Sequence, residues 1–493
     1  MANGSGTPLP RATRRTRSGA EYSPWANAVA LSVPHVRLTQ LLRRRDEGPD
    51  SDTESLDDSD SDDDEAAPPA PQPLAAPAPS APRPSAFIRV APPGHPPGTR
   101  LPNGLMPGSV IRVARVALPQ KKATAAEAVA RLRVRQTVPA LQLNLSINDY
   151  AAPVAASGWQ AIRQHEPDAR EHDLDEMRRT HPDMCVYDWD GTPTPVIDAD
   201  RNVLLLLGGE PPNKPAWVPD VVNVSAEAMQ QAAEEIYTGP KWRRKAGLDD
   251  PVPRRGSHHA KHVGVAMGGG QRYPQNLAHA ARNLGIFARL FSLRCLLRIA
   301  GWTNVLFMAF APDLHEYYRR TYAALCDWDR LQRRAKHIRR NFPEHHSVFT
   351  TATFNFGPVT VTLPHIDFGN LAWGWCAVTA LGNFNPDRGG HLVLWDLKLI
   401  IRFPPGSTIL LPSVILRHSN LKIGPHETRF SFTQFTPAGI FRWVYNDFRT
   451  DRDINAANST TQTEQERRKR DREGRWQEGL RMYRKWDGPI RSV

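Results

Sequence analysis

The chain has 493 residues, of which 45 are proline and 40% are hydrophobic, a low apolar share that indicates a globular part joined to a long disordered one. Its four scattered cysteines, with no CxxC pair, argue against a disulfide scaffold and a cysteine-rich zinc module. No apolar run approaches the ~18 residues that a membrane span needs. We therefore expect an intracellular, soluble protein in a reducing compartment.

Charge is distributed unevenly along the chain. The formal net charge is +12, but segment 46–65 holds twelve acidic residues and no basic one. Removing those twelve negative charges leaves the rest of the chain at +24. A globular part this basic is typical of proteins that bind a polyanion, and nucleic acid is favoured over a membrane surface.

Residues 1–123 are predicted to be a disordered, acidic and proline-rich region. After the acidic run, segment 66–107 contains fourteen of the prolines, interleaved with alanine and serine. Such a composition favours extended polyproline conformations and buries too little apolar surface to offset its ordering entropy. The acidic run is interpreted as a solvated tether. Mimicry of nucleic acid and phosphorylation of its serines are the alternatives.

The folded part is predicted to begin near Thr124, with a helper region over residues 124–262. The expected elements are a short helix over 125–135, a β-hairpin over 194–207, and a helix from Ser225 to about Tyr237. The basic stretches 241–245 and 254–262 are predicted to be exposed. Within the second stretch, the spacing of three histidines (His258, His259, His262) could suit zinc, although a phosphate-facing or solvated role is favoured.

Two longer helices follow. Apolar residues recur at three- and four-residue spacing from Leu277 to Ile299, and Gly301 is expected to end this helix. A second helix is expected to begin at Pro312, a favoured first-turn residue. It should bury the apolar residues Leu314, Tyr317, Leu325 and Trp328.

From Ser347 the hydrophobic period changes to that of strands. Five β-branched or alternating runs are present, at 347–356, 359–367, 391–403, 407–418 and 428–437. Helices first and strands second predict an α+β domain over 263–450, with a sheet backed by the helices. The basic tail, residues 451–493, is predicted to be largely helical.

The sharpest functional signal is the pair His365 and Asp367 on a predicted strand. Residues two apart on a strand point to the same face, so both side chains could bind one metal ion. His418, about fifty residues later, ends another predicted strand and could supply a third ligand. Two histidines and one carboxylate form the facial triad of non-haem Fe(II) oxygenases, which leaves positions open for co-substrate and oxygen. The HxD pattern alone is weak.

Arg429 is the fourth element of this pattern. It lies on an alternating strand, where it shares a face with Ser431 while Phe430 and Phe432 lie on the other face. An arginine fork binds a carboxylate through two parallel hydrogen bonds, as the distal carboxylate of 2-oxoglutarate requires. An ordinary surface arginine beside a core histidine is the alternative. The combination of HxD, a distal histidine and this arginine favours an Fe(II)/2-oxoglutarate site.

Several segments resemble the TET/JBP family of 2-oxoglutarate/Fe(II) dioxygenases, in particular its fungal branch. They are PHIDFGNLAWGWCAVTALGNF, RGGHLVLWDLKLIIRFPPGSTILLPS, LRHSN and TRFSFTQF, within a resemblance that spans about residues 260–448. The stretch MGGGQRYPQN is also typical of the fungal branch. The resemblance implies a double-stranded β-helix (jelly-roll or cupin-like) core with supporting helices. It also implies oxidation of methyl groups on DNA bases, notably 5-methylcytosine or thymine.

The resemblance assigns site residues. His365, Asp367 and His418 match the iron ligands, and the Arg429–Ser431 pair matches the residues that bind the distal carboxylate of 2-oxoglutarate.

Two further assignments have equal or simpler alternatives. Asn370 matches an asparagine that hydrogen-bonds the flipped base, but it could equally be a turn residue. His391 matches a histidine that contacts the keto-acid end of 2-oxoglutarate, but it could be an ordinary strand histidine.

The sequence departs from the animal members of the family. Four scattered cysteines cannot build their cysteine-rich zinc region, so the DNA duplex must be held differently here. The glycine run 268–270 allows close backbone approach to DNA. Trp373 and Trp375 alternate along a predicted strand, and core packing is favoured over stacking on a base.

The predicted function is an Fe(II)/2-oxoglutarate dioxygenase that uses O2 to oxidise the methyl group of a modified base in double-stranded DNA. The nucleus is the expected location. The base must be flipped out of the duplex, and the basic surface should bind phosphates. The alternatives are N6-methyladenine demethylation, hydroxylation of a protein, and a non-enzymatic, transposon-associated DNA-binding protein.

The basic tail is expected to add duplex affinity. In the alternative interpretation, its helix docks on the catalytic domain through Trp476, Leu480 and Tyr483.

Overall fold

A computed structural model describes residues 139–492, apart from 165–169, 212–214, 238–255, 257, 333–335 and 458–461. Before residue 139 it describes two short ladders, formed by β1 (Arg14–Arg15) with β2 (Glu21–Tyr22) and by β3 (Ile88–Arg89) with β4 (Val110–Ile111). The rest of region 1–123, the helix expected over 125–135 and the basic stretch 241–245 lie outside the described residues. None of the described helices combines the length and apolar character needed to cross a membrane.

A double-stranded β-helix forms the centre of the fold. Its strands are β11 (Thr351–Phe356), β12 (Cys376–Asn383), β13 (Leu392–Leu394), β14 (Leu399–Ile401), β15 (Thr408–Leu411), β16 (His418–Asn420) and β17 (Thr428–Phe435). The order β11-β17-β12-β15 occurs in the large sheet and β16-β13-β14 in the small one. Segment 362–365 lies antiparallel beside β16, and Val359 before it forms a parallel bridge to Arg429 of β17. Apart from β13 and β14, which pair in the small sheet, consecutive segments alternate between the two sheets as in a jelly roll, which confirms the predicted α+β fold.

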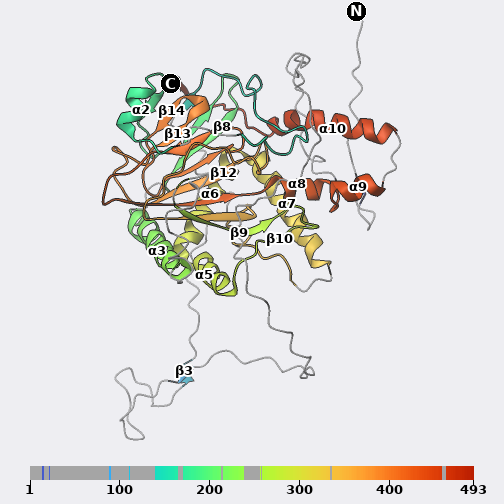
Figure 1. Cartoon of the computed structure of the whole chain (residues 1–493), viewed down its shortest axis with the longest axis horizontal. Coiled ribbons are helices and arrows are strands. Elements are labelled where there is room, and N and C mark those ends of the chain that lie inside the picture. Colours follow the sequence, from blue (N-terminus) through green and yellow to red (C-terminus); the bar gives the residue numbers. More distant parts are fainter. Residues whose placement is uncertain are drawn as a thin grey trace, which may run out of the picture. The chain divides into compact units, whose positions relative to one another are not determined.

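Strands from outside the core extend both sheets (Figure 1). The large sheet continues through β9 (His259–Ala266) and β10 (Gln275–Asn276) at one edge, and through β8 (Val203–Gly209), β7 (Thr194–Ile197), β5 (Ala140–Gln142) and β18 (Ile490–Ser492) at the other. In the small sheet, β6 (Cys185–Tyr187) pairs with β14. The antiparallel pair β7–β8 confirms the hairpin predicted over 194–207. The helper region and the tail therefore contribute to the same sheet as the core.

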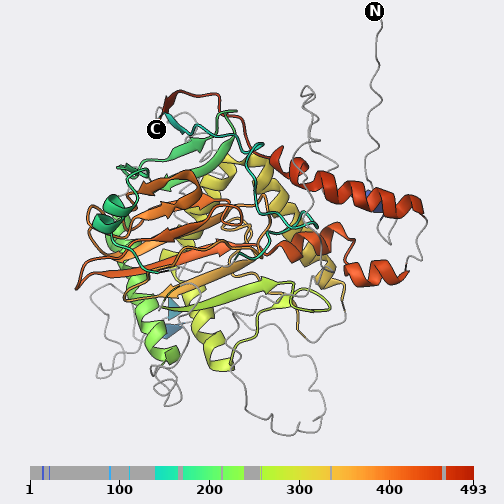
Figure 2. The same cartoon turned by 45° about the horizontal axis from the view of Figure 1, so that its top comes forward.

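Helices lie on the outer faces of the sheets, and the last two in the chain project beyond one end of them (Figure 2). They are α2 (Leu174–Thr180), a π-helical turn (Val218–Asn223) leading into α3 (Val224–Tyr237), α5 (Ala281–Ser292), α6 (Arg294–Phe310), α7 (Pro312–Arg330), α8 (Ala438–Tyr445), α9 (Asp451–Ala457) and α10 (Gln462–Leu480). Helices α3, α5 and α6 pack their apolar faces on the large sheet, in one cluster with Phe354 and Phe432. Helix α2 packs on the small sheet. The helices predicted at Ser225–Tyr237 and from Pro312 are confirmed.

The single helix predicted from Leu277 to Ile299 is wrong in its extent. Leu293 adopts an extended backbone (φ −67°, ψ 134°) and separates α5 from α6. Gly301 does not end α6, which continues to Phe310. The helix tolerates this glycine, at a cost of about 1 kcal/mol, because the following turns bury Leu306 and Phe307 in the core, and each such burial stabilises by ~1.5–3 kcal/mol.

Three predicted strands also differ from the structure. Run 359–367 makes only isolated bridges, and run 391–403 is interrupted by a 3-10 turn (Trp395–Leu397) followed by Lys398 in the left-handed region (φ 51°). Run 407–418 divides into β15 and the start of β16. Trp373 and Trp375 lie in a turn, and both are fully buried, so their predicted packing role is confirmed although the strand is not.

The tail docks on the β-helix domain, as the alternative interpretation proposed. Leu480 and Tyr483 are buried in the main hydrophobic core, and Trp476 packs against it. A Cβ atom on Gly479 would lie 2.2 Å from the Trp373 ring, so α10 approaches the core there more closely than a larger residue allows. Residues 490–492 then add β18 beside β5. Deletion of residues 460–493 would therefore remove part of the core.

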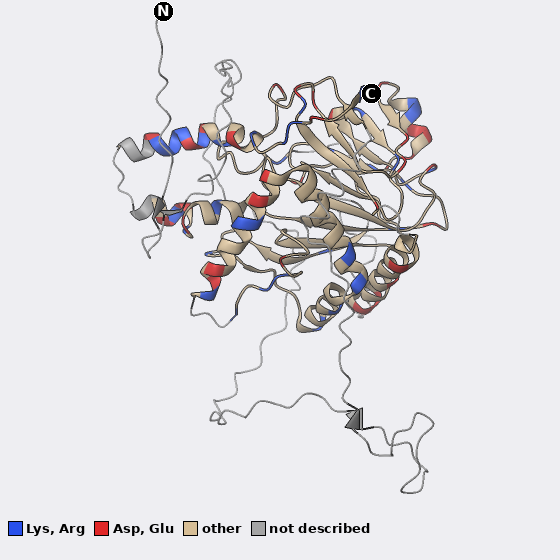
Figure 3. Cartoon of the chain, turned by 180° about the vertical axis from the view of Figure 1, so that it is seen from behind, with Lys and Arg blue, Asp and Glu red and all other residues tan. Residues whose placement is uncertain are grey.

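Charges on α10 are mixed rather than uniformly basic. Figure 3 shows blue and red bands along this helix, and the ion pairs Arg467–Asp471 (3.3 Å) and Lys469–Glu473 (3.9 Å) lie within it. These carboxylates offset part of the positive charge on which the expected duplex affinity of the tail depends.

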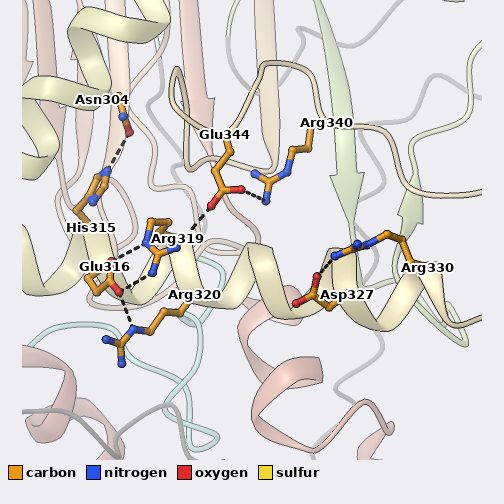
Figure 4. A network of polar contacts seen from close by, with 9 residues as sticks. All are labelled: Asn304, His315, Glu316, Arg319, Arg320, Asp327, Arg330, Arg340 and Glu344. Atoms are coloured by element: carbon orange, nitrogen blue, oxygen red, sulfur yellow. Dashed lines mark hydrogen bonds and ion pairs between the residues drawn. The ribbon is translucent and has the colours of Figure 1, made fainter. Parts of the chain in front are cut away.

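An ion-pair network runs along α7 (Figure 4). Glu316 accepts hydrogen bonds from Arg319 (2.7 and 2.8 Å) and Arg320 (2.6 Å). Glu344 bridges Arg319 (3.5 Å) and Arg340 (3.7 Å). The Arg319 hydrogen bonds, with help from Arg320, lower the pKa of Glu316 to about 2. This carboxylate therefore stays ionised in the folded protein well below the pH at which it is protonated in the unfolded chain.

We predict that Glu316→Gln lowers the free energy of unfolding by about 0.5–1 kcal/mol at pH 7, a small value because the pair is solvent-screened. A depressed carboxyl pKa stabilises the fold above the unfolded pKa, and this stabilisation is lost as pH falls toward about 2. Urea unfolding of wild type and variant from pH 7 to pH 3 should therefore show a difference that shrinks below about pH 4.5. A difference that stays constant with pH would contradict the network's role.

Candidate metal centre

His365 and His418 lie directly opposite each other on two antiparallel segments. The backbone N–H of each residue donates to the carbonyl oxygen of the other, at 3.1 and 2.9 Å. Residues opposite one another in an antiparallel pair point to the same face. Their imidazole rings accordingly lie 4.4 Å apart, measured between ring centroids.

Asp367 completes the group. Its backbone N–H donates to the Ser413 carbonyl (2.9 Å), which holds the residue beside the two histidines. One carboxylate oxygen lies 3.7 Å from His365 Nε2 and the other 4.0 Å from His418 Nε2. One potential ligand atom from each of the three residues lies within 4.8 Å of the others, and within the described ranges no other such group occurs. The structure thus brings the three predicted ligands together.

Backbone carbonyls orient both imidazoles for metal binding. His365 Nδ1 lies 2.8 Å from the Leu363 carbonyl oxygen, and His418 Nδ1 lies 2.9 Å from the Leu416 carbonyl oxygen. A carbonyl only accepts, so each Nδ1 carries the proton and each Nε2 presents a lone pair toward Asp367. This arrangement is the one that metal-ligating histidines usually adopt.

The donor atoms are poorly accessible to water. The side chains of His365, Asp367 and His418 are 8%, 13% and 9% exposed. Burial, followed by the charge of Asp367, raises the pKa of the nearby Cys376 thiol to about 12. This thiol therefore stays protonated and does not compete as a thiolate ligand. The centre is a two-histidine, one-carboxylate site, which suits Fe(II) with open positions.

Arg429 is buried without an acidic partner in the described chain. Its Nη1 donates to the Thr360 carbonyl (3.1 Å), whereas its Nε makes no hydrogen bond. Burial lowers the pKa of Arg429 to about 10, so the guanidinium is still charged at neutral pH. An unpaired buried cation is costly. The side chain is therefore suited to receive an incoming carboxylate.

Thr360 links this guanidinium to the metal-ligand strand, a connection that the sequence analysis missed. The Thr360 carbonyl also accepts from the Asn420 amide (3.2 Å), and Asn420 lies two residues after His418 on β16. Two residues span about 7 Å along a strand, comparable with the length of a five-carbon dicarboxylate. The contact uses a backbone oxygen, which has no signature in sequence.

Ser431 lies on β17 as predicted, and its hydroxyl accepts a hydrogen bond from the Asn355 amide (2.9 Å). The hydroxyl proton is left to donate to another acceptor. Ser431 is buried, as is Arg429 two residues before it.

Asn370 serves as a turn residue directly after the metal ligands. Its backbone N–H donates to the Asp367 carbonyl (3.0 Å), and it forms a backbone bridge to Pro437. Its half-exposed side-chain amide makes no hydrogen bond within the described chain. The turn role is thus present, and the amide is free to bind another group.

His391 does not join the candidate site. Its carbonyl accepts from Leu421 N–H (2.9 Å), and Leu421 and Val393 pack with α2 on the outer face of the small sheet. His391 lies two residues before Val393 and so shares that outer face. Burial, followed by the charge of Arg178 on α2, lowers the pKa of His391 to about 4. The structure thus places His391 apart from the three candidate ligands, and its contact with a keto acid stays a prediction.

The histidines at the start of β9 do not form a metal site either. His258 Nδ1 contacts the Val361 carbonyl (3.2 Å), His259 stacks on Tyr237, and His262 Nδ1 contacts the Thr353 hydroxyl (2.6 Å). These partners lie on three different segments, so the three rings do not converge on one point.

Comparisons with known proteins give weak matches. No family model and no curated protein matches the sequence. Among solved structures, the chain is similar to NgTET1 in complex with 5mC DNA, with 15% identity, a TM-score of 0.32, and coverage of 56% of this chain and 91% of that one. It is also similar to an oxidoreductase of the 2OG-Fe(II) oxygenase family from Burkholderia pseudomallei, with 17% identity, a TM-score of 0.21, and coverage of 43% and 88%. The fold assignment therefore depends on the strand order itself.

We predict that His365→Ala or Asp367→Ala abolishes Fe(II) binding while the protein stays folded, because each change removes one of three ligands without altering a backbone hydrogen bond. Anaerobic Fe(II) titration should detect the loss, and circular dichroism should show an unchanged fold. His391→Ala is the matched control and should bind Fe(II) as wild type does. Retained Fe(II) affinity in the Asp367 variant would rule out the assigned centre.

Proposed function

We propose that this protein is an Fe(II)/2-oxoglutarate-dependent dioxygenase. The observation that carries the proposal is the pairing of two features in one β-helix. His365, Asp367 and His418 present three converging donors, and Arg429 presents a buried, uncompensated guanidinium linked through Thr360 to the ligand strand. A metal ion alone would need the first feature only. The second favours an anionic co-substrate that reaches from the metal to the arginine.

The residues present fit these groups. Fe(II) with 2-oxoglutarate and O2 supplies the oxidant that hydroxylates a C–H bond, with succinate and CO2 as coproducts. The two imidazoles and the Asp367 carboxylate would hold the metal through Nε2 and oxygen donors. Arg429 would bind the distal carboxylate of 2-oxoglutarate, and the Ser431 hydroxyl is placed to donate to the same group. The low exposure of the donors limits access of water.

We propose a modified base in DNA as the substrate, with a methyl group of the 5-methylcytosine or thymine type as the reacting group. The resemblance of the motifs around His365, His418 and Arg429 to TET/JBP enzymes supports this substrate, as does the +24 charge outside the acidic run. The amide of Asn370, which has no hydrogen-bond partner among the described residues, could hydrogen-bond the edge of a flipped base three residues after Asp367. Flipping costs a few kcal/mol, and phosphate contacts offset this cost.

The decisive experiment incubates the purified full chain with Fe(II), 2-oxoglutarate, O2 and a duplex carrying 5-methylcytosine, followed by mass spectrometry of the nucleosides. Hydroxymethyl-, formyl- or carboxylcytosine is the expected product, and the Asp367→Ala protein is the control. A parallel duplex with N6-methyladenine tests the demethylase alternative. Succinate formation that no duplex stimulates would contradict a DNA substrate.

We predict that Arg429→Lys raises the KM for 2-oxoglutarate roughly ten- to a hundred-fold, since lysine keeps the charge but loses the bidentate fork. A charge-assisted hydrogen bond contributes ~1.5–3 kcal/mol, which corresponds to that range. Arg429→Ala should be worse. The measurement is a 2-oxoglutarate titration at saturating Fe(II) and DNA.

The control for this titration is Arg402→Lys, because Arg402 pairs with Asp387 (2.5 Å) away from the site. It should leave the KM unchanged. An unchanged KM in Arg429→Lys would mean that another cation holds the co-substrate.

A further inference from the structure

A small lobe beside the candidate site has its own hydrophobic core. The core contains Val265 from β9 and Met267 directly after it, Tyr322 and Leu325 from α7, and Ile440, Trp443 and Val444 from α8, with Ile338 and Phe448 packed against it. We call this unit, with its surface segments 268–276, 336–339 and 447–453, the α7–α8 lobe.

Five exposed cations lie on the lobe surface: Arg272, Lys336, Arg339, Arg449 and Arg452. They come from three segments that the structure holds side by side. The Asn276 side chain ties two of them, because its amide donates to the His337 carbonyl (3.0 Å) and accepts from Arg339 N–H (3.1 Å).

The third segment packs on the same lobe core, where Phe448 stacks on Trp328 of α7 at 5.8 Å between ring centroids. Hydrogen bonds from the Thr450 hydroxyl and backbone, followed by the charges of Arg272 and Arg452, hold the pKa of Asp453 below its usual range. Both arginines are therefore close to the first turn of α9.

These five cations have no ion-pair partner among the described residues. The arginines of the neighbouring α7 are different. Arg319 and Arg320 pair with Glu316, and Arg330 pairs with Asp327 (Figure 4). Charged groups left unpaired in a cluster repel one another, and a bound polyanion relieves this repulsion.

Acidic residues on the lobe neutralise only part of the cluster. Asp447 lies on the same segment as Arg449, and the exposed Asp453 faces Arg272 and Arg452. Asp329 is buried and bonded to His337 (3.0 Å) and the Ile338 N–H (2.9 Å). Asp451 is occupied by Arg442 (3.5 Å) and the Asn446 amide (2.7 Å). Positive charge therefore remains in excess on this surface.

The lobe is joined firmly to the turn that follows the metal ligands. At the start of α8, Ala438 N–H donates to the Gly369 carbonyl (3.0 Å), and Pro437 bridges Asn370. A Cβ atom on Gly439 would lie 2.1 Å from the Met267 carbonyl oxygen, so the backbone of α8 contacts the residue that follows β9 with no room for a side chain between them. A polyanion held on the lobe is thus held beside the candidate site.

The loop between β9 and β10 is exposed and can contact an extended polyanion. Gly269 (φ 55°) and Gly270 (φ 76°) turn the backbone through the left-handed region, and a Cβ atom on Gly270 would meet nothing within 4 Å. The exposed side chains of Arg272 and Tyr273 follow this turn. The tip is therefore narrow and cationic.

We propose that the α7–α8 lobe is the surface that binds the phosphate backbone of duplex DNA and positions the duplex over the metal centre. The inference rests on the proposed function for the identity of the polyanion. Arginine and lysine side chains that reach phosphates supply affinity without reading the sequence of bases. The lobe would thus supply part of the duplex affinity that was expected from the basic tail.

The test compares two triple variants of the full chain. The first is Arg272→Gln, Arg339→Gln and Arg449→Gln, which neutralises three unpaired lobe cations. The control is Arg289→Gln, Arg320→Gln and Arg330→Gln, which removes the same charge from arginines paired with Glu235, Glu316 and Asp327. Fluorescence anisotropy of a labelled, unmethylated duplex between 50 and 200 mM NaCl gives Kd and its salt dependence, with equal melting temperatures as a check on folding.

Each phosphate contact contributes about 0.9 to the slope of log K against log salt. We expect the lobe variant to lose up to about 2.7 from this slope and to bind more weakly at 50 mM, while the control keeps the wild-type slope. An unchanged slope in the lobe variant, an equal loss in both variants, or no duplex binding by wild type would overturn the proposal.

Failure of the lobe proposal and failure of the proposed function give different results in these experiments. Binding does not need Fe(II), so Asp367→Ala should retain the wild-type slope. If wild type binds duplex with a lobe-dependent slope but yields no oxidised base, the lobe is confirmed as a DNA-binding surface and the proposed reaction is wrong. If oxidised base forms while the lobe variant binds as wild type does, the reaction stands and the lobe assignment is wrong.

Discussion

The antiparallel contact between segment 362–365 and β16 is the constraint on which the candidate site depends. Two backbone hydrogen bonds place His365 opposite His418, and this register decides that both rings point to one face. A shift of one residue would turn one histidine to the outer face, because side chains alternate along a strand. The sheets, the covering helices and the docked tail all act to hold this register. The chemistry of the site is therefore a property of the whole β-helix.

Burial of the Arg429 guanidinium affects both carboxylate binding and folding stability. The same burial that strengthens its attraction for a carboxylate leaves the ligand-free protein with a charged group that has one carbonyl partner. A bound dicarboxylate would offset this cost and so stabilise the fold as well as take part in turnover. Binding of co-substrate and folding stability are thus linked at one side chain.

The site residues were predicted from the sequence more accurately than the boundaries of the helices and strands around them. The HxD pair, His418 and Arg429 carry chemistry at a recognisable spacing, and the structure brings the three ligands together. His391 is assigned from the family resemblance alone, and its place on the outer face of the small sheet could not be predicted, because an isolated strand does not reveal which of its faces will turn inward. Helix boundaries failed at Leu293 and Gly301, where tertiary burial overrides local preference. The Thr360 contact uses only a backbone oxygen, so no side-chain pattern could have predicted it.

The pairing of β5 with β18 has a consequence for how the chain folds. These strands bring residues 140–142 beside residues 490–492, which closes a loop of about 350 residues, and the entropy of such closure grows with the logarithm of loop length. Contacts this distant in sequence form late and slow the folding reaction. The edge of the large sheet is therefore completed only after residues 490–492 have left the ribosome. Until then, the apolar surface that Trp486 and Ile490 cover in the folded protein is exposed, and it can bind chaperones or aggregate.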